Sequence, residues 1–120
     1  EFGILLKFVE FCLNSYIISI NEPLEISIDI TNTGNIAGKE IVQVYFRDNT
    51  SSTTSAVKQL CGFKKVYIIP QETKTISFTI NPEEFGLYNE NNEFVIEKGS
   101  FKIFVGPNSV DLLEGEFTIR

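Results

Sequence analysis

The sequence has no histidine, and this absence removes several common kinds of chemistry. Histidine is the usual general base near neutral pH, it completes Ser–His and Cys–His nucleophile pairs, and it supplies many zinc ligands. Cysteine is scarce as well, because Cys12 and Cys61 are too few for a disulfide framework. We expect two unpaired, buried thiols, since free cysteine is among the most buried residue types. An intersheet disulfide between them is the alternative.

Basic residues and long apolar runs are also in short supply. The chain has 10 Lys and Arg residues against 16 Asp and Glu residues, which gives a net charge of −6. Nucleic acids and anionic membrane surfaces are bound through clustered Lys and Arg, and here Lys64 and Lys65 form the only adjacent basic pair. No apolar run approaches the roughly 20 residues of a membrane-spanning helix. We therefore expect no nucleic-acid partner and no membrane partner.

The beginning of the chain shows no targeting segment. Residues 1–7 contain neither an initiating Met nor the basic start of a signal peptide. The chain therefore looks like a fragment or an excised domain, and its localisation stays open. Its 120 residues fit a single domain.

Apolar and polar residues alternate with a period of two through most of the chain, which is typical of half-buried β-strands. In residues 40–47, the most apolar of these stretches, we expect Val42, Val44 and Phe46 to face the core. Gln43 and Tyr45, which lie between them, are expected to face outward. Similar alternation runs through residues 25–31, 75–80, 100–105 and 116–119. Turn-forming residues separate these segments, so the sequence predicts an all-β fold, an immunoglobulin-like antiparallel β-sandwich of about seven strands.

A pair of carboxylates is the remaining option for catalysis. The candidates all lie in or near turns, where water hydrates their charge, whereas a general acid needs burial or a like-charged neighbour. They are Glu83, Glu84, Glu90, Glu93, Asp111 and Glu114. The chain also has no phosphate-binding glycine loop and no Asp-x-Asp-x-Asp run typical of calcium sites. We therefore expect no catalytic residue, no cofactor and no metal site.

Four aromatic residues are not explained by strong alternation: Phe63, Tyr67, Phe85 and Tyr88. Core packing is the favoured interpretation for them, because aromatic rings fill the cores and ends of sandwiches and because the chain has no Trp for a sugar platform. If the chain does bind carbohydrate, then Phe63, Tyr67 and Tyr88 are the candidates for the sugar contacts.

Residues 30–48 carry the most specific pattern in the chain, which reads ITNTG and then AGKEIVQVYFRD. Related stretches follow in order at residues 57–66, 70–76 and 95–106. Together they resemble, over residues 30–119, the fibronectin type III-like domain at the C-terminal end of many glycoside hydrolase family 3 enzymes. Residues 2–11 more weakly resemble the junction with the preceding domain of such enzymes. We accordingly divide the chain into a junction segment (1–13) and a β-sandwich (14–120).

The resemblance implies a parent enzyme of the β-glucosidase or β-xylosidase type, whose nucleophilic Asp and acid/base Glu lie on earlier domains. Neither catalytic motif matches this chain, so the chain alone is not expected to be an enzyme. The implied role is a non-catalytic accessory domain that packs against the catalytic domains of the parent glycosidase and stabilises them. The expected docking surface consists of Gln43 and Tyr45 together with Phe2, Phe8 and Phe11.

Two other functions stay open beside this one. The chain could act alone as a carbohydrate-binding module, or it could be an independent partner-binding β-sandwich. Two positions depart from the family pattern, since Ala56 stands where Pro is usual and Gln71 where a turn glycine is usual. We expect both turns to be looser than in the family.

Overall fold

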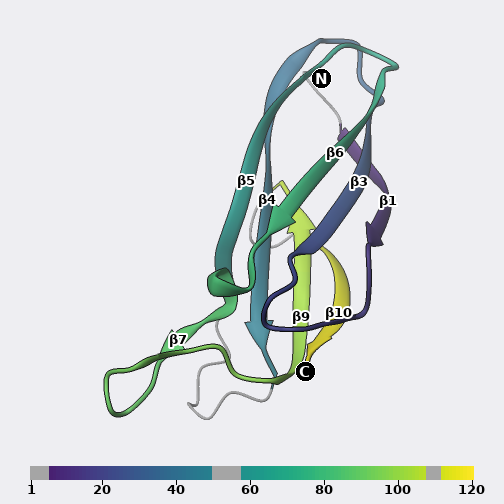
Figure 1. Cartoon of the computed structure of the whole chain (residues 1–120). Coiled ribbons are helices and arrows are strands. Elements are labelled where there is room, and N and C mark those ends of the chain that lie inside the picture. The colour runs from purple at the N-terminus through teal and green to yellow at the C-terminus, as the bar shows by residue number, and fades with distance from the viewer. Residues whose placement is uncertain (1–5, 50–57, 108–111) are drawn as a thin grey trace.

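The chain folds as two β-sheets packed face to face (Figure 1). In the described part of the chain, the strand pairs of these sheets are antiparallel, except that strand Ile17–Ile18 pairs parallel with strand Leu113–Ile119. The computed structural model describes residues 6–49, 58–107 and 112–120, apart from the side chains of Val9 and Glu10. One sheet has the order β1-β3-β6, with strands Leu6–Leu13, Leu24–Asn32 and Thr73–Ile80. The other has the order β2-β10-β9-β4-β5, with strands Ile17–Ile18, Leu113–Ile119, Gly99–Gly106, Gly38–Asp48 and Gln59–Ile68. This architecture confirms the predicted all-β sandwich.

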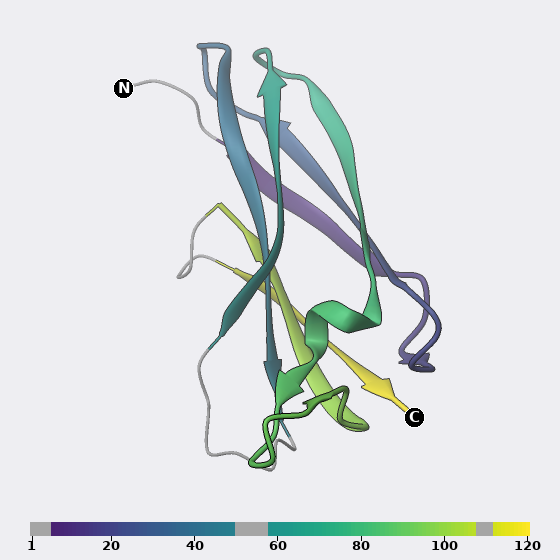
Figure 2. The ribbon, with the colours of Figure 1, turned by 60° about the vertical axis from the view of Figure 1, so that its left-hand side comes forward.

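Figure 2 shows the two sheets as separate layers. The hydrophobic core lies between them and consists of the alternating positions of their strands. Val42, Val44 and Phe46 of β4 are buried, as the alternation predicts. The other sheet residues of the core are Ile18, Leu24, Ile26, Ile28, Ile30, Val66, Ile68, Ile76, Phe78, Ile80, Phe101, Ile103, Val105, Phe117 and Ile119. Full burial of one such side chain contributes about 1.5–3 kcal/mol, so this core is the main stabilising feature of the domain.

The connection between β6 and β9 first covers one end of the core and then leaves the sandwich. It begins with a single 3-10 turn, η1 (Pro82–Phe85), in which Pro82 is tolerated because the first N–H groups of a helix have no helical partner. Phe85 is 1% exposed, and its ring centroid lies 5.1 Å from that of Phe46. The chain then forms a hairpin of β7 (Leu87–Tyr88) and β8 (Phe94–Val95), which projects from the sandwich (Figure 1).

Asn32, a fully buried polar residue, joins the β3–β4 turn to the β5–β6 turn. Its Oδ1 accepts a hydrogen bond from the Gly34 N–H (2.9 Å), and its Nδ2 donates to the carbonyl oxygens of Ile36 (2.9 Å) and Ile68 (3.1 Å). Its own carbonyl accepts from the N–H of Gln71 (2.8 Å). Gln71 adopts a φ of 67°, which glycine favours, and the Glu72 N–H donates a hydrogen bond across this turn to the carbonyl oxygen of Ile69 at 3.1 Å. That the turn is looser than in the family stays a prediction. Ala56 lies outside the described residues.

Two lysines close the side of the sandwich where the edges of β5 and β6 meet. Lys64 of β5 donates a hydrogen bond to the carbonyl oxygen of Ser77 in β6. Lys74 of β6 donates in return to the carbonyl oxygen of Tyr67 in β5, at 2.6 Å. These bonds satisfy carbonyl groups at strand edges, and charged side chains at an edge also oppose pairing with another chain.

The segment 1–13, which we assigned to a domain junction, contributes a strand to the sandwich. Its described residues form β1, which pairs antiparallel with β3 from Leu6 to Leu13. Its role in meeting a preceding domain stays a prediction. Within the described part of the chain, we find no helix with the length and apolar character that crossing a membrane requires.

Candidate docking surface on the outer face of β4 and β5

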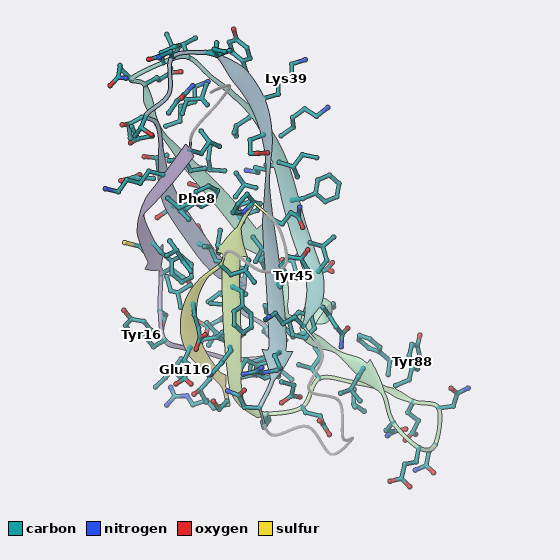
Figure 3. All side chains as sticks on the ribbon, turned by 180° about the vertical axis from the view of Figure 1, so that it is seen from behind. Phe8, Tyr16, Lys39, Tyr45, Tyr88 and Glu116 are labelled. Carbon is teal, nitrogen blue, oxygen red and sulfur yellow. The ribbon has the colours of Figure 1, made fainter. Side chains whose placement is uncertain are left out.

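The outward side chains of β4 and β5 form one continuous surface, which we call the β4–β5 face. The two strands pair antiparallel, so that Ile41 lies opposite Lys65, and Gln43 lies opposite Phe63. The complete set of outward residues is Lys39, Ile41, Gln43, Tyr45 and Arg47 from β4, and Leu60, Phe63, Lys65 and Tyr67 from β5. Figure 3 shows Lys39 near one end of this face and Tyr45 near the middle of β4.

Gln43 and Tyr45 are half-buried on this face and are fixed by hydrogen bonds. The Tyr45 hydroxyl donates to Oε1 of Gln43, and Nε2 of Gln43 donates to the carbonyl oxygen of Pro107 at 3.1 Å. Their predicted outward orientation is therefore confirmed. Because these side chains already have partners within the chain, they offer a rigid surface whose ordering costs little further entropy on binding. Their part in docking remains a prediction.

Large apolar side chains adjoin this pair on the β4–β5 face and are exposed to solvent. Phe63 is 66% exposed and Tyr67 is 51% exposed, while Ile41 and Leu60 beside them are exposed as well. Scattered apolar residues are normal on a protein surface, but a group on adjoining strands of one sheet is typical of an interaction site. The face therefore has the composition expected of a surface that another molecule covers.

Phe104 of β9 is part of this side of the sheet, although sequence reasoning missed it. It lies opposite Tyr45 on the neighbouring strand and is buried, yet it is separate from the core between the sheets. The cations of Arg47 and Lys58 cover it, at 5.7 Å and 5.2 Å from the ring centroid. The apolar run 103–105 was the available sequence signal, because strict alternation would place a polar residue at its centre.

The aromatic residues expected to dock from the junction segment have a role inside the domain. Phe8 and Phe11 are half-buried and pack against the core from β1. Phe11 approaches β10 so closely that a Cβ added to Gly115 would lie 2.8 Å from its Cε2 atom. Only the exposed parts of these two rings are left for docking. Their part in docking stays a prediction. Phe2 lies outside the described residues.

The three candidate sugar-contact residues do not form one platform. Phe63 and Tyr67 share the β4–β5 face, but they are about 13 Å apart along the strand, with Lys65 between them. Tyr88, 67% exposed, lies on the projecting β7–β8 hairpin, where its ring centroid is 5.4 Å from that of Phe94 (Figure 3). The favoured expectation of core packing was therefore wrong for these three residues. It is confirmed for the fourth aromatic residue, Phe85.

The two cysteines are free thiols, as expected, but they differ in exposure. Cys12 is exposed, which corrects the expectation that both are buried, because it lies opposite Ser27 on the outer face of its sheet. Cys61 is half-buried at a bulge in β5 and packs against the core. Burial, with a smaller contribution from the carboxylate of Glu84, raises the pKa of the Cys61 thiol to about 12.

This difference predicts selective thiol labelling. With a disulfide reagent at pH 8, we expect Cys12 to react first and Cys61 at least about 100-fold more slowly, because only the thiolate attacks and a raised pKa depletes it. The rates are measured by absorbance on the Cys12→Ser and Cys61→Ser variants, each of which retains one thiol. Adding denaturant should bring the two rates together, and equal rates in the folded chain would contradict the buried placement of Cys61.

The described residues contain no cluster suited to a metal or to acid–base catalysis. No group of three His, Cys, Asp or Glu side chains that could hold a metal ion occurs among them. The described turn carboxylates are exposed, as expected, and Glu114 forms an ion pair with Lys102 at 2.9 Å. Asp111 lies outside the described residues.

Comparison with known proteins places this sandwich among parts of larger enzymes. A family model described as "Fibronectin type III-like domain" matches residues 40–109. The chain is 39% identical over 97 residues to a β-xylosidase of Formosa agariphila, a match that covers 81% of this chain and 13% of that protein. It is also 39% identical over 97 residues to the thermostable β-glucosidase B of Acetivibrio thermocellus, covering 80% of this chain and 13% of that protein.

A solved structure gives the same picture at the level of the fold. The β-glucosidase of Listeria innocua superposes with a TM-score of 0.86 at 35% identity, and the match covers 98% of this chain and 16% of that one. The chain thus spans less than one-sixth of each of the two curated relatives named above, at 13%. It matches a domain of such enzymes and not their catalytic part.

Proposed function

Because the chain belongs to the fibronectin type III-like domain family, we propose that it is a non-catalytic accessory domain that packs against the catalytic domains of a β-glucosidase-like glycosidase and stabilises them. The matched relatives carry this domain as a small share of a much longer polypeptide. The observation that carries the proposal is the exposed group of Ile41, Leu60, Phe63 and Tyr67 on the β4–β5 face. Covering apolar surface of this kind is favourable at about 25 cal/mol per Å².

The rigidity of the β4–β5 face supports this role. A regular two-strand surface, with Gln43 and Tyr45 held by hydrogen bonds, presents its apolar side chains in a fixed arrangement. Pre-organised surfaces lose less conformational entropy when they associate. A partner domain that packs on this face would be restrained in turn, which is how an accessory domain raises the stability of its neighbour.

A second candidate function, a carbohydrate-binding module, is favoured by the exposure of Phe63 and Tyr67. Affinity electrophoresis of the 120-residue chain through gels that contain a soluble glucan tests it. Retardation that is lost in the Phe63→Ser variant would support sugar binding. Normal migration in every glucan would reject it.

The accessory role predicts that the β4–β5 face is covered in the full-length polypeptide that contains this chain. Hydroxyl-radical labelling of Phe63 and Tyr67 should fall several-fold relative to the 120-residue chain, because an interface excludes solvent from its centre. Tyr16, which is 71% exposed and lies outside this face, serves as the internal reference.

A matched pair of substitutions tests whether the β4–β5 face stabilises the full-length polypeptide. Tyr67→Ser should lower the thermal midpoint of the full-length polypeptide, since it removes an apolar contact between domains. Tyr16→Ser removes an even more exposed ring elsewhere, at 71% against 51% for Tyr67, and should leave that midpoint unchanged. In the labelling experiment, equal labelling of Phe63 and Tyr67 in the 120-residue chain and in the full-length polypeptide would refute the proposal.

A further inference from the structure

The β4–β5 face is cationic, although the chain as a whole carries a net charge of −6. The charged residues at its outward positions are Lys39, Arg47 and Lys65, and Lys58 directly precedes β5. No Asp or Glu occupies an outward position of either strand. The outer face of the other sheet differs, because β3 and β6 present mainly Ser and Thr there, together with acidic residues such as Asp29. The positive charge is therefore concentrated on the same surface as the exposed apolar side chains.

Among the residues that the structure describes, none forms an ion pair with Lys39 or Lys65. Lys102, on the adjacent strand β9, is by contrast paired with Glu114 at 2.9 Å. Arg47 and Lys58 lie over the ring of Phe104 instead, which positions their charge without cancelling it.

The strand register places Lys39 and Arg47 at the two ends of the face and Lys65 among its apolar side chains. Lys39 lies opposite Tyr67 at one end of the face, and Arg47 lies about 27 Å away along β4 at the other end. Phe63 and Ile41 lie between them on adjoining strands. An apolar centre with a polar or charged border is the usual composition of a protein–protein interface.

We propose that the β4–β5 face docks onto a protein surface of the same polypeptide whose carboxylates face Lys39 and Lys65. The inference rests on the proposed function and names the chemistry of the partner. Complementary charge is what recognises that surface, because unpaired cations beside exposed apolar side chains disfavour a neutral or basic partner. The exposed aliphatic residues Ile41 and Leu60 fit protein packing, and Lys65 interrupts the two aromatic rings that a sugar chain would need in a row.

Charge reversal in the full-length polypeptide tests this partner chemistry. In the variant Lys39→Glu/Lys65→Glu, radical labelling of Phe63 and Tyr67 should rise at least about threefold at about 20 mM NaCl, because attraction across the interface becomes repulsion. At about 500 mM NaCl the difference from the unmodified protein should shrink, since salt screens exposed charges. Lys39 and Lys65 are exposed, so the 120-residue variant should unfold at the same denaturant concentration as the unmodified chain.

The control is Lys98→Glu/Arg120→Glu, which changes the net charge equally at exposed positions away from this face and from the junction segment. If both double variants label alike while Tyr67→Ser still exposes the face, the charge inference is overturned and the accessory role stands. If the face is unprotected even in the unmodified full-length polypeptide, both fail. If polygalacturonate in a gel retards the 120-residue chain and the Lys39→Glu/Lys65→Glu variant is not retarded, the partner is an acidic polysaccharide and the protein-docking inference is wrong.

Discussion

Asn32→Asp is expected to lower the free energy of unfolding of the 120-residue chain by about 2–5 kcal/mol, because it places a carboxylate against two buried carbonyl oxygens. The amide nitrogen of Asn32 donates to the carbonyl oxygens of Ile36 and Ile68, and the substitution replaces both donated bonds with repulsion. The bond that Oδ1 accepts from Gly34 would survive. Urea denaturation followed by circular dichroism measures the change.

The control for this prediction lies in the same turn. Asn35 is exposed, so Asn35→Asp should change the free energy of unfolding by less than about 0.5 kcal/mol. The loss in the free energy of unfolding caused by Asn32→Asp should also be smaller at acidic pH. Burial raises the pKa of the new carboxyl above its unfolded value, so the protonated form is regained in the folded state first as pH falls, and that form donates one of the two lost bonds. Equal losses in the two variants would show that the Asn32 network does not hold the turns together.

The sequence was sufficient to predict the sheets because each strand buries one face. Val42, Val44 and Phe46 alternate with polar or amphipathic residues, and only one placement of β4 puts all three into the core. The same argument fails on β1. A bulge between Phe8 and Glu10 shifts the alternation, so Phe8 and Phe11 both face inward although they are three positions apart. Sequence alone does not reveal such a bulge, and we assigned these rings to a docking surface from the resemblance of residues 2–11 to a domain junction.

The candidate site could be predicted only in part, because its chemistry depends on cross-strand neighbours. The outward orientation of Gln43 and Tyr45 follows from alternation within one strand. The concentration of charge does not, since Lys39 and Lys65 are far apart in the sequence and meet only through the register of β4 with β5. Phe104 likewise breaks the apolar–polar alternation of β9, and only the structure shows that Arg47 and Lys58 cover its ring. The basic residues look scattered in the sequence, whereas the fold brings Lys39, Arg47 and Lys65 onto one face.

The four aromatic residues without clear alternation show the same limit most directly. Phe63 and Phe85 cannot be told apart by composition or local pattern, and core packing was the general expectation for both. The sandwich places Phe85 under the η1 turn at the end of the core, at 1% exposure, and leaves Phe63 at 66%. The difference is one of tertiary position, which is why the same substitution should change the stability of the 120-residue chain far more at Phe85 than at Phe63.

Phe85→Ala is expected to cost about 3–5 kcal/mol of the free energy of unfolding, comparable to the whole stability of many small domains. Phe85 closes an aromatic cluster, with its ring centroid 5.0 Å from that of Phe117 and 5.8 Å from that of Phe101. Removing it leaves a cavity that η1 can fill only by moving the chain on both sides. Phe63→Ala, at an exposed position, should change the stability of the 120-residue chain by less than about 0.5 kcal/mol.

If Phe85→Ala does not fold, Phe85→Leu keeps the prediction testable, because it retains most of the buried volume and should cost roughly 1–2 kcal/mol. Urea denaturation of the three variants gives the ranking directly. In the full-length polypeptide the difference in stability between Phe85→Ala and Phe63→Ala should be smaller, because Phe63→Ala removes part of the proposed interface there. Phe63→Ala then lowers the stability of the full-length polypeptide, although it hardly changes that of the isolated chain. A Phe85→Ala chain as stable as Phe63→Ala would mean that η1 does not cover the core, and it would remove the packing argument on which the placement of β4, β9 and the docking face depends.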